Sequence, residues 1–444
     1  MVLAWPVILS RVGILMMTTV DVIVVGRAGA DQLAFYVLGY AIYDSLVAMV
    51  AGLHLGVPTL VSRTIGAGAP VHAALVWKRG LVSAIVIGSV IALIVQGAPW
   101  LFTLLGQDRT LAEGGGEVTA LLGMCLPFFG LFLVSAMFLE ALEKPLQATL
   151  AVLLANVLNL GLSITLVFGI GPIPALGAWG CALATLVTAS FLGVGLYCYV
   201  FFGLRDRQRY GIGTPTTADA DQAVHAPTWR EQSRVGLASG VSYGLEAGSF
   251  TALTLIAGLL GVIGLAAMGV LFQLFAVTFM ISFGIAGATQ VRVGNAWGRG
   301  SLRDMVWAGW AGFSLSVFCS LVFCALFLLA PRWFLGILTT DEAVLLAAAP
   351  VMVWMVAALI ADGGQTVLNH ACRGRGDSWV PTLAHLVSYW AIMVPLGWVL
   401  AVHLGGGPLG LYQAILLSSV FSLFAMAMRF VVLSRRGLPD VAVA

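Results

Sequence analysis

Long apolar runs separated by short polar clusters make up most of this chain. Dividing the sequence at its polar, glycine and proline clusters leaves twelve apolar runs. A helix of about 20 apolar residues is long enough to cross the hydrocarbon core of a bilayer. The pattern therefore predicts twelve membrane-spanning helices, over residues 2–26, 33–57, 79–104, 118–140, 146–170, 175–202, 235–260, 264–289, 306–330, 344–371, 380–403 and 409–432.

The composition agrees with a membrane protein built from helices. The 444 residues are 60% hydrophobic and 9% charged, with a mean hydropathy of +1.03. Soluble domains carry about 25% charged residues, so this chain is too poor in charge to cover a soluble surface. A membrane barrel would instead show alternating strands of about ten residues. The fold class expected is an all-α polytopic membrane protein.

Several function classes have no signal in the sequence. The net charge of +2 gives no indication of nucleic-acid binding, and no phosphate loop, zinc spacing or nucleophile elbow is present. We therefore expect no cofactor. The six cysteines have no paired spacing and are interpreted as small core residues. The apolar start of the chain has no basic leader or small-residue cleavage site, so we expect a first membrane helix rather than a signal peptide.

The basic residues predict the orientation. With a cytoplasmic N-terminus, the odd-numbered loops hold only Arg27, Arg109 and Arg332. The even-numbered loops and the C-terminus hold the others, namely Arg63, Lys78, Arg79, Lys144, Arg205, Arg207, Arg209, Arg230, Arg234, Arg292, Arg299, Arg303, Arg373, Arg375, Arg435 and Arg436, with Arg429 close by. The positive-inside rule then predicts that both termini face the cytoplasm.

The two halves of the chain repeat each other. Adding 232 to a first-half position carries seven residues onto identical second-half residues, namely Gly26, Gly29, Leu33, Ala34, Gly52, Gly66 and Gly68. A long hydrophilic segment lies between spans six and seven. We expect an N-terminal lobe over residues 1–203, a cytoplasmic linker over 204–234 and a C-terminal lobe over 235–444. Because each half has an even number of spans, the repeat is parallel and predicts two pseudo-symmetric six-helix lobes around a central cavity.

Asp362 lies in the middle of an apolar run that extends from Val351 to Arg373. Gln365 and Asn369 follow it at helical spacing, so one face of this helix is polar. A carboxylate at the centre of a membrane helix costs roughly 2.5–3.5 kcal/mol, which marks it as a functional candidate. The alternative is an aspartate paired with a neighbouring helix for packing.

Glu246 is the second intramembrane carboxylate of this half. It shares a polar helix face with Tyr243 and several serines. On another face, glycines recur at every fourth position, as in seams that let helix backbones approach closely; they are Gly236, Gly240, Gly244 and Gly248. A chance carboxylate satisfied by its serine and tyrosine neighbours is the alternative.

The first half contributes two further carboxylates. Asp21 lies near the outer end of the first span, where it either serves a site or reaches the interface by snorkelling. Asp44 lies beside an aromatic row of Tyr36, Tyr40 and Tyr43, whose faces could attract an organic cation or simply pack. The amide residues inside the spans have two explanations, namely a functional role or hydrogen bonds between helices. The amides concerned are Asn156 and Asn159 in span five and Gln273 in span eight.

Taken together, these residues resemble the multidrug and toxic compound extrusion (MATE) family of transporters. The opening segment PVILSRVGILMMTTVDVIVVGRAGADQLA is similar to the first span of that family, with Asp21 at its recurrent aspartate. The segments PTLVSRTIGAG and VRVGNAWGRG resemble two copies of one family loop motif. LLANVLNLGLSITLVFG resembles the fifth span, and HACRGRGDSWVPTLAHLVSYW the connection between spans ten and eleven.

The resemblance is greatest to the NorM-like branch, in which spans seven and ten carry acidic residues at the positions of Glu246 and Asp362. It implies a two-lobed exporter that exchanges organic cations or amphipathic compounds for H⁺ or Na⁺. Two departures stand out. Asn159 matches a family asparagine, but Ser163 stands where a related branch has an acidic residue. The Arg373-Gly374 pair corresponds to Glu140-Ala141 in the first half.

The expected function is therefore secondary antiport in a bacterial inner membrane, and the protein is expected to be a monomer. Glu246 and Asp362 are expected to bind the coupling cation, with assistance from Asp21. The candidates for the substrate cavity are Asp44, Tyr36, Tyr40, Tyr43, Asn156, Asn159, Tyr243, Gln273, Gln365 and Asn369. Burial favours a protonated carboxylate, whereas two carboxylates with neutral oxygens nearby would suit Na⁺. Both H⁺ and Na⁺ therefore stay candidates for the coupling ion.

Two other functions were weighed. A lipid-linked saccharide flippase of similar architecture would line its cavity with basic residues, and Arg11 is the one basic side chain placed clearly inside a span. A membrane-embedded enzyme would gather its catalytic groups at one depth, but the six histidines lie mainly near span ends or in loops. Neither alternative is favoured.

Overall fold

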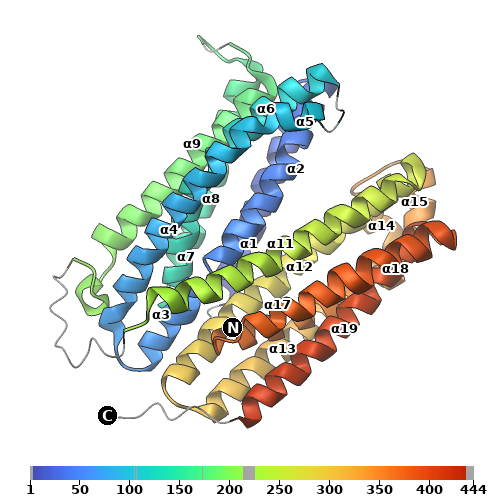
Figure 1. Ribbon diagram of the computed structural model, residues 1–444. Coiled ribbons are helices and arrows are strands. Elements are labelled where there is room, and N and C mark those ends of the chain that lie inside the picture. The colour runs from blue at the N-terminus through green and yellow to red at the C-terminus, as the bar shows by residue number, and fades with distance from the viewer. Residues whose placement is uncertain (1–3, 105, 107, 173, 214–225, 437–444) are drawn as a thin grey trace. The chain divides into compact units, whose positions relative to one another are not determined.

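Helices account for nearly all of the chain in the computed structural model (Figure 1), which describes residues 4–104, 106, 108–172, 174–213 and 226–436. These ranges contain no strand. Eleven helices or runs of joined helices within them are long and apolar enough to cross a membrane. Helix α11 (Trp229–Gly258, 30 residues) is the twelfth long helix, and the carboxylate, serines and glycines in it interrupt its apolar pattern. The structure thus agrees with a twelve-helix, all-α membrane fold.

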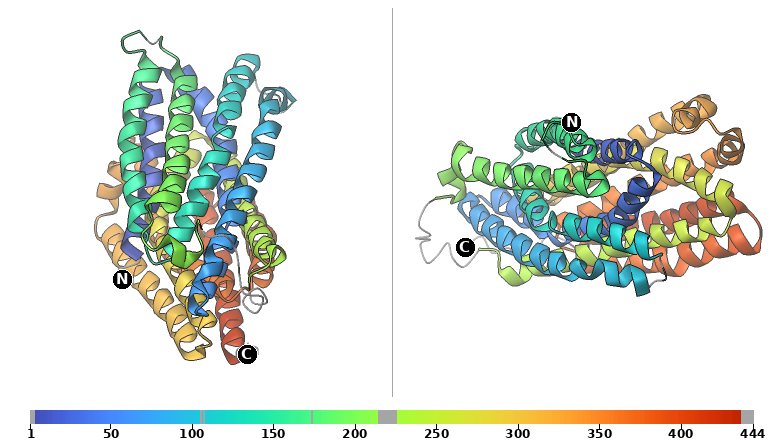
Figure 2. Two further views of the ribbon diagram at one scale, coloured as in Figure 1. Left: turned by 90° about the vertical axis from the view of Figure 1, so that its left-hand side faces the viewer. Right: turned by 90° about the horizontal axis from the view of Figure 1, so that it is seen from above.

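In the first half, single spans often consist of two consecutive helices. Pairs of this kind form the spans Ala30–Gly66, Pro70–Leu104 and Arg109–Ala141. The elements are α1 (Ala4–Gly26), α2 (Ala30–Leu53), α3 (Gly56–Gly66), α4 (Ala73–Ile94), α5 (Ala98–Leu104), α6 (Arg109–Gly123), α7 (Leu126–Ala141), α8 (Leu146–Phe168) and α9 (Gly177–Cys198). Figures 1 and 2 show α4 beside α7 and α8 beside α9.

In the second half, most spans are long continuous helices. After α11 come α12 (Gly261–Gly298), α13 (Leu302–Leu329), α14 (Pro331–Gly336), α15 (Glu342–Ala348), α16 (Met352–Gly374), α17 (Trp379–His385), α18 (Val394–Trp398) and α19 (Gly407–Arg435). A π-helical segment, η6 (Leu386–Met393), joins α17 to α18, and another, η7 (Val399–His403), follows α18. Helix α16 packs against α12, α13 and α19, so it lies inside this group of helices.

Some predicted boundaries were wrong because hydropathy locates the apolar part of a helix and not its ends. Helix α12 continues to Gly298, nine residues past the predicted end, and therefore includes Arg292. Helix α6 begins at Arg109 instead of residue 118 and includes Glu113 and Glu117. Side-chain capping sets several of the true starts. The Asp108 carboxylate accepts a hydrogen bond from the backbone of Thr110, for example.

The chain forms two compact units, which we describe separately. One comprises residues 9–240, and the other comprises the start of α1 through Ile8 together with the chain from Val241 onward. The division falls within α11. The lobe and linker limits expected from the sequence stay a prediction.

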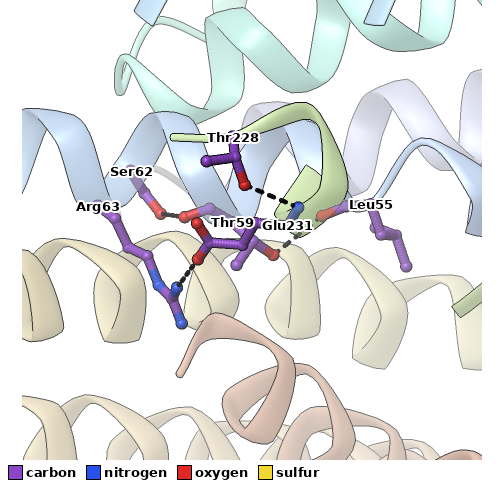
Figure 3. A network of polar contacts seen from close by, with 6 residues as sticks. All are labelled: Leu55, Thr59, Ser62, Arg63, Thr228 and Glu231. Carbon is purple, nitrogen blue, oxygen red and sulfur yellow. Dashed lines mark hydrogen bonds and ion pairs between the residues drawn. The ribbon is translucent and has the colours of Figure 1, made fainter. Parts of the chain in front are cut away.

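Polar contacts connect the start of α11 to first-half residues of the unit that comprises residues 9–240, which we call the first unit (Figure 3). Arg63 of α3 donates to the Glu231 carboxylate at 3.0 Å, and the backbone N–H of Glu231 donates to the Thr228 hydroxyl at 3.1 Å. The amide of Gln232 donates to the backbone oxygen of Val76 at 3.0 Å. This part of α11 therefore belongs with first-half helices.

The glycine seam predicted on α11 packs closely at its beginning. A Cβ atom on Gly236 would lie 2.1 Å from the backbone oxygen of Leu53, and one on Gly240 would lie 2.6 Å from the Leu53 side chain. Gly244 differs, because a Cβ atom there would have no neighbour within 4 Å. The small residues thus permit backbone contact along part of the seam.

Candidate functional site

Asp362 is buried in the middle of α16 and lies at the centre of a polar network. Its side chain is 1% exposed. One carboxylate oxygen, Oδ1, accepts hydrogen bonds from Gln365 Nε2 at 3.3 Å and from Ser419 Oγ of α19 at 3.2 Å. The other oxygen, Oδ2, has no hydrogen-bond partner among the described residues. The carboxylate therefore keeps one acceptor available to a proton or cation.

Gln365 connects Asp362 to two other helical segments. Its Nε2 also donates to the Tyr389 hydroxyl at 3.1 Å. Its Oε1 lies 3.1 Å from Ser422 Oγ and 2.9 Å from His385 Nε2. Tyr389 belongs to the π-helical segment η6, a type of local distortion that occurs frequently at functional sites. Gln365, a cavity candidate from the sequence, thus holds the network together.

The hydrogen bonds determine the tautomer of His385. Arg373 can only donate, and its Nη2 does so to Ser242 Oγ at 2.9 Å. The other ring nitrogen of His385, Nε2, faces the acceptor Gln365 Oε1 at 2.9 Å and therefore carries the ring proton, so Nδ1 accepts from Ser242 Oγ, 2.8 Å away. We assign this tautomer from the network. A directed chain of donors consequently runs from Arg373 through Ser242, His385 and Gln365 to Asp362.

Asn369 completes this face of α16. Its Nδ2 lies 3.0 Å from His385 Nε2, while its Oδ1 has no hydrogen-bond partner among the residues described. Rotating the terminal amide by half a turn would point its oxygen at the Nε2–H of His385, which removes the conflict between two donors. Asn369 therefore stabilises the His385 ring and does not contact Asp362 directly.

Glu246 lies on α11, is partly exposed and belongs to the same unit as Asp362. It interacts with the Tyr389 hydroxyl and lies within electrostatic range of both Asp362 and Arg373. The structure thus brings together two carboxylates that are 116 positions apart in the sequence. We call Asp362, Glu246, Gln365, Tyr389, His385, Ser242, Ser419 and Arg373 the second-half polar site.

One member of this site lies elsewhere than the sequence predicts. The basic-residue pattern places Arg373 in a cytoplasmic loop, but Arg373 lies within α16 and its side chain is fully buried. Its guanidinium carbon is 5.1 Å from the centre of the Tyr243 ring. Tyr243 in turn shares a hydrogen bond of 3.1 Å with His370, a residue the sequence analysis left out together with His385 and Tyr389. The spacing pointed to Arg373, because it follows Asn369 by one turn on the polar face.

Asp21 of α1 has its own site in the first unit. It is 2% exposed, so the snorkelling alternative is wrong. Ser163 of α8 donates to its Oδ1 at 2.9 Å, while Tyr36 of α2 and Thr185 of α9 donate to its Oδ2, each at 3.3 Å. These three donors are neutral. Asp21 therefore contributes a buried carboxylate that hydroxyl groups surround.

The aromatic row of α2 leads from Asp21 toward Asp44. Tyr36 and Tyr40 stack with ring centres 5.7 Å apart, and Tyr43 meets Tyr40 edge-on, also at 5.7 Å. Tyr40 shares a hydrogen bond of 2.9 Å with Thr18 and donates to Asp44 at 3.4 Å. Asp44 itself is exposed in the structure. These contacts join the row into one polar strip, and none of them places Asp44 on Asp21.

The three amide candidates differ in their surroundings. Asn156 donates to the backbone oxygens of Gly13 and Val152 at 3.0 and 2.9 Å, which ties α8 to α1 and favours the packing interpretation. Asn159 is completely buried, and neither of its amide atoms has a hydrogen-bond partner among the described residues. Gln273 lies partly exposed on α12. Asn159 thus stays a candidate beside Asp21, one helical turn before Ser163.

A sodium ion bound by the described residues would be coordinated by fewer than three carboxylates. The described residues hold no group of three or more His, Cys, Asp or Glu side chains arranged to bind a metal ion. The second-half polar site does offer two carboxylates with the neutral oxygens of Ser419 and Tyr389 nearby. Na⁺, like other hard cations, is suited by oxygen ligands, so this donor set fits it.

Comparison with known proteins gives three consistent results. The family model described as MatE matches residues 6–165 and again residues 238–399, so the two matches begin 232 residues apart, as the internal repeat predicts. The chain is 34% identical over 435 residues to a "Probable multidrug resistance protein NorM" of Caulobacter vibrioides, a match that covers 98% of this chain and 91% of that protein. A protein of the same name from Brucella suis is 29% identical and covers 92% of this chain and 87% of its own length.

Solved structures share the fold. The eukaryotic MATE transporter AtDTX14 superimposes with a TM-score of 0.85 over 97% of this chain and 94% of its own, at 20% identity. An outward-facing multidrug resistance MATE family transporter superimposes with a TM-score of 0.86 over 97% of this chain and 95% of its own, also at 20% identity. At this level of identity the likeness concerns the fold alone.

Proposed function

Because this chain belongs to the MatE family of membrane transporters, we propose that it is a secondary antiporter that exports organic cations or amphipathic drugs in exchange for H⁺ or Na⁺. The family membership excludes the enzyme alternative. The names of the relatives, which are probable multidrug resistance proteins, support drug export. The proposal includes a bacterial inner membrane location, cytoplasmic termini and a monomer.

The observation that carries the proposal is that one oxygen of the buried Asp362 carboxylate has no hydrogen-bond partner among the described residues. A fully buried carboxylate with one oxygen free of hydrogen bonds is costly unless a proton or cation neutralises it. Glu246 adds a second acidic group within electrostatic range. The site is thus suited to hold a cation in one state of a transport cycle and to release it in another.

Exchange follows if coupling cation and substrate compete for the same negative charge. A site that has released its proton or Na⁺ carries a net negative charge that attracts a cationic drug. Return of the coupling ion neutralises the carboxylates and weakens the binding of that drug. Asp21, which neutral donors surround, would supply a second acidic group in the first unit. A flippase for pyrophosphate-linked lipids is not favoured, since the half-buried Arg11 and the buried Arg373 both lie near acidic groups.

The test is transport by the purified protein in proteoliposomes under separately imposed H⁺ and Na⁺ gradients. An ethidium-like dye should leave faster when one of the gradients is present, and collapse of that gradient should abolish the difference. Glu246→Gln and Asp362→Asn should each abolish gradient-driven export, and the double variant should lose little more, because residues of one ion site act as a unit. Dye export that is independent of both gradients would refute antiport.

A further inference from the structure

Arg373 places a positive charge next to the proposed coupling site. A guanidinium stays ionised in a protein, and a buried ion requires compensation by an opposite charge. Its Nη2 is bonded to Ser242, and its plane lies over Tyr243, both of which are neutral. Its Nε and Nη1 have no hydrogen-bond partner among the described residues. Glu246 supplies the negative charge within its electrostatic range.

The internal repeat shows that this arrangement differs between the two halves. The repeat offsets of 232 and 233 place Arg11 at the position of Tyr243 and Glu140 at the position of Arg373. In the first unit these two residues form a direct ion pair at 3.2 Å, so their charges cancel locally. In the second unit an aromatic ring stands where the first has a charge. Compensation for Arg373 must therefore come from the carboxylates of the second-half polar site.

The hydrogen bonds of His385 and of the neighbouring His370 fit neutral rings. His385 accepts from Ser242 at Nδ1 and donates from Nε2, as the hydrogen-bond chain requires. His370 lies with Nδ1 2.9 Å from the backbone oxygen of Thr366 and with Nε2 facing the Tyr243 hydroxyl, which fits a neutral ring. The titratable groups within electrostatic range of Arg373 are Tyr243 and Glu246 of α11, Cys372 of α16, His385 of α17 and Tyr389 of η6.

We propose that Arg373 is a tethered counter-cation of the Asp362–Glu246 site and limits it to one net negative charge when both carboxylates are ionised. One monovalent coupling cation then neutralises this single net negative charge. The first unit reaches the same net charge by a different route, with the single carboxylate of Asp21 among neutral donors. This inference rests on the proposed function, and Arg373 acts in it as a positioning residue through the two carboxylates.

The test is charge compensation between two positions. Glu246→Gln alone leaves one carboxylate and one guanidinium in the second-half polar site, so the site has no net charge to attract the coupling ion. Gradient-driven export per folded molecule should fall at least tenfold. Arg373→Gln alone leaves two uncompensated carboxylates and should also impair export at least tenfold. The double variant Glu246→Gln/Arg373→Gln restores one net negative charge, and its export should recover to within about threefold of wild type.

Two control variants separate charge from structure. Arg373→Lys keeps the charge without the planar guanidinium and should retain most of the export. Glu231→Gln/Arg373→Gln removes the same two charges from the chain, but Glu231 lies at the start of α11 and pairs with Arg63. This variant should show no recovery over Arg373→Gln. Size-exclusion profiles normalise every variant to folded protein.

A binding measurement keeps the inference independent of transport. The melting temperature of the purified protein should rise with Na⁺ or with added acid in wild type and in the compensated double variant, and the rise should be absent in Glu246→Gln. A double variant that folds but neither binds nor exports better than Glu246→Gln would overturn the counter-cation role. Recovery of binding without gradient-driven export by wild type would retain that role and reject antiport instead.

Discussion

Replacing Asp362 by asparagine removes a charge while keeping nearly all contacts of the side chain. The asparagine oxygen can take the place of Oδ1, which accepts from Gln365 and Ser419. Its amide nitrogen replaces Oδ2, which has no hydrogen-bond partner among the described residues. No described hydrogen bond is lost and a buried charge disappears, so we expect stability within about 1 kcal/mol of wild type.

The effect on cation binding should be far larger. Two unit charges 4 Å apart interact by about 4 kcal/mol at an effective dielectric constant of about 20. Since about 1.4 kcal/mol corresponds to a tenfold change, the loss of this attraction predicts a roughly thousandfold weaker affinity for the coupling cation. Gradient-driven export should then fall to the level of empty liposomes. The contrast between unchanged stability and lost coupling is the signature of an ion site.

The assay compares dye export per folded molecule with the melting temperature of the same preparation. Asp304→Asn is the matched control, because Asp304 is an exposed carboxylate at the start of α13 that pairs with Arg299. It should export normally. Near-normal export by Asp362→Asn would refute the coupling role and leave the fold untouched. A variant that exports poorly and also melts far below wild type would show instead that Asp362 is structural.

Three further predictions concern other parts of the molecule. Glu140→Gln removes the carboxylate that pairs with the half-buried Arg11 and should destabilise the protein by about 3–5 kcal/mol, with partial recovery in Arg11→Gln/Glu140→Gln; equal melting temperatures would contradict a role of this ion pair in stability. Gly236→Ala forces a Cβ atom against the backbone of Leu53 and should cost about 1–3 kcal/mol, whereas Gly244→Ala on the same helix has open space and should be neutral or stabilising. In a cysteine-free background, single cysteines at positions 219 and 342 should be labelled from opposite sides of the membrane, and labelling from one side would contradict the orientation that the basic loops predict.

The amino-acid sequence by itself determined the membrane class, the helical spans and the acidic residues of the second-half site. These features are local, since a run of apolar residues and a carboxylate inside it can be recognised without knowing what lies next to them. The spacing of Asp362, Gln365 and Asn369 also fixed one polar helix face, and the structure places all three in a single network. Glu246 was singled out for the same reason, its cost inside a membrane.

The tertiary structure decided which polar groups meet. Glu140 pairs with Arg11, 129 residues away, and nothing in the sequence around Glu140 indicates that partner for a residue at the end of a span. His385 ends α17 and Tyr389 lies in the π-helical segment that follows, and both meet Gln365 only because this separate segment packs against α16. Arg373 looked like a loop residue because the predicted span ends at residue 371, but α16 continues through Arg373 and buries it. Burial and pairing between helices depend on how separate segments pack, and hydropathy along one segment does not contain that information.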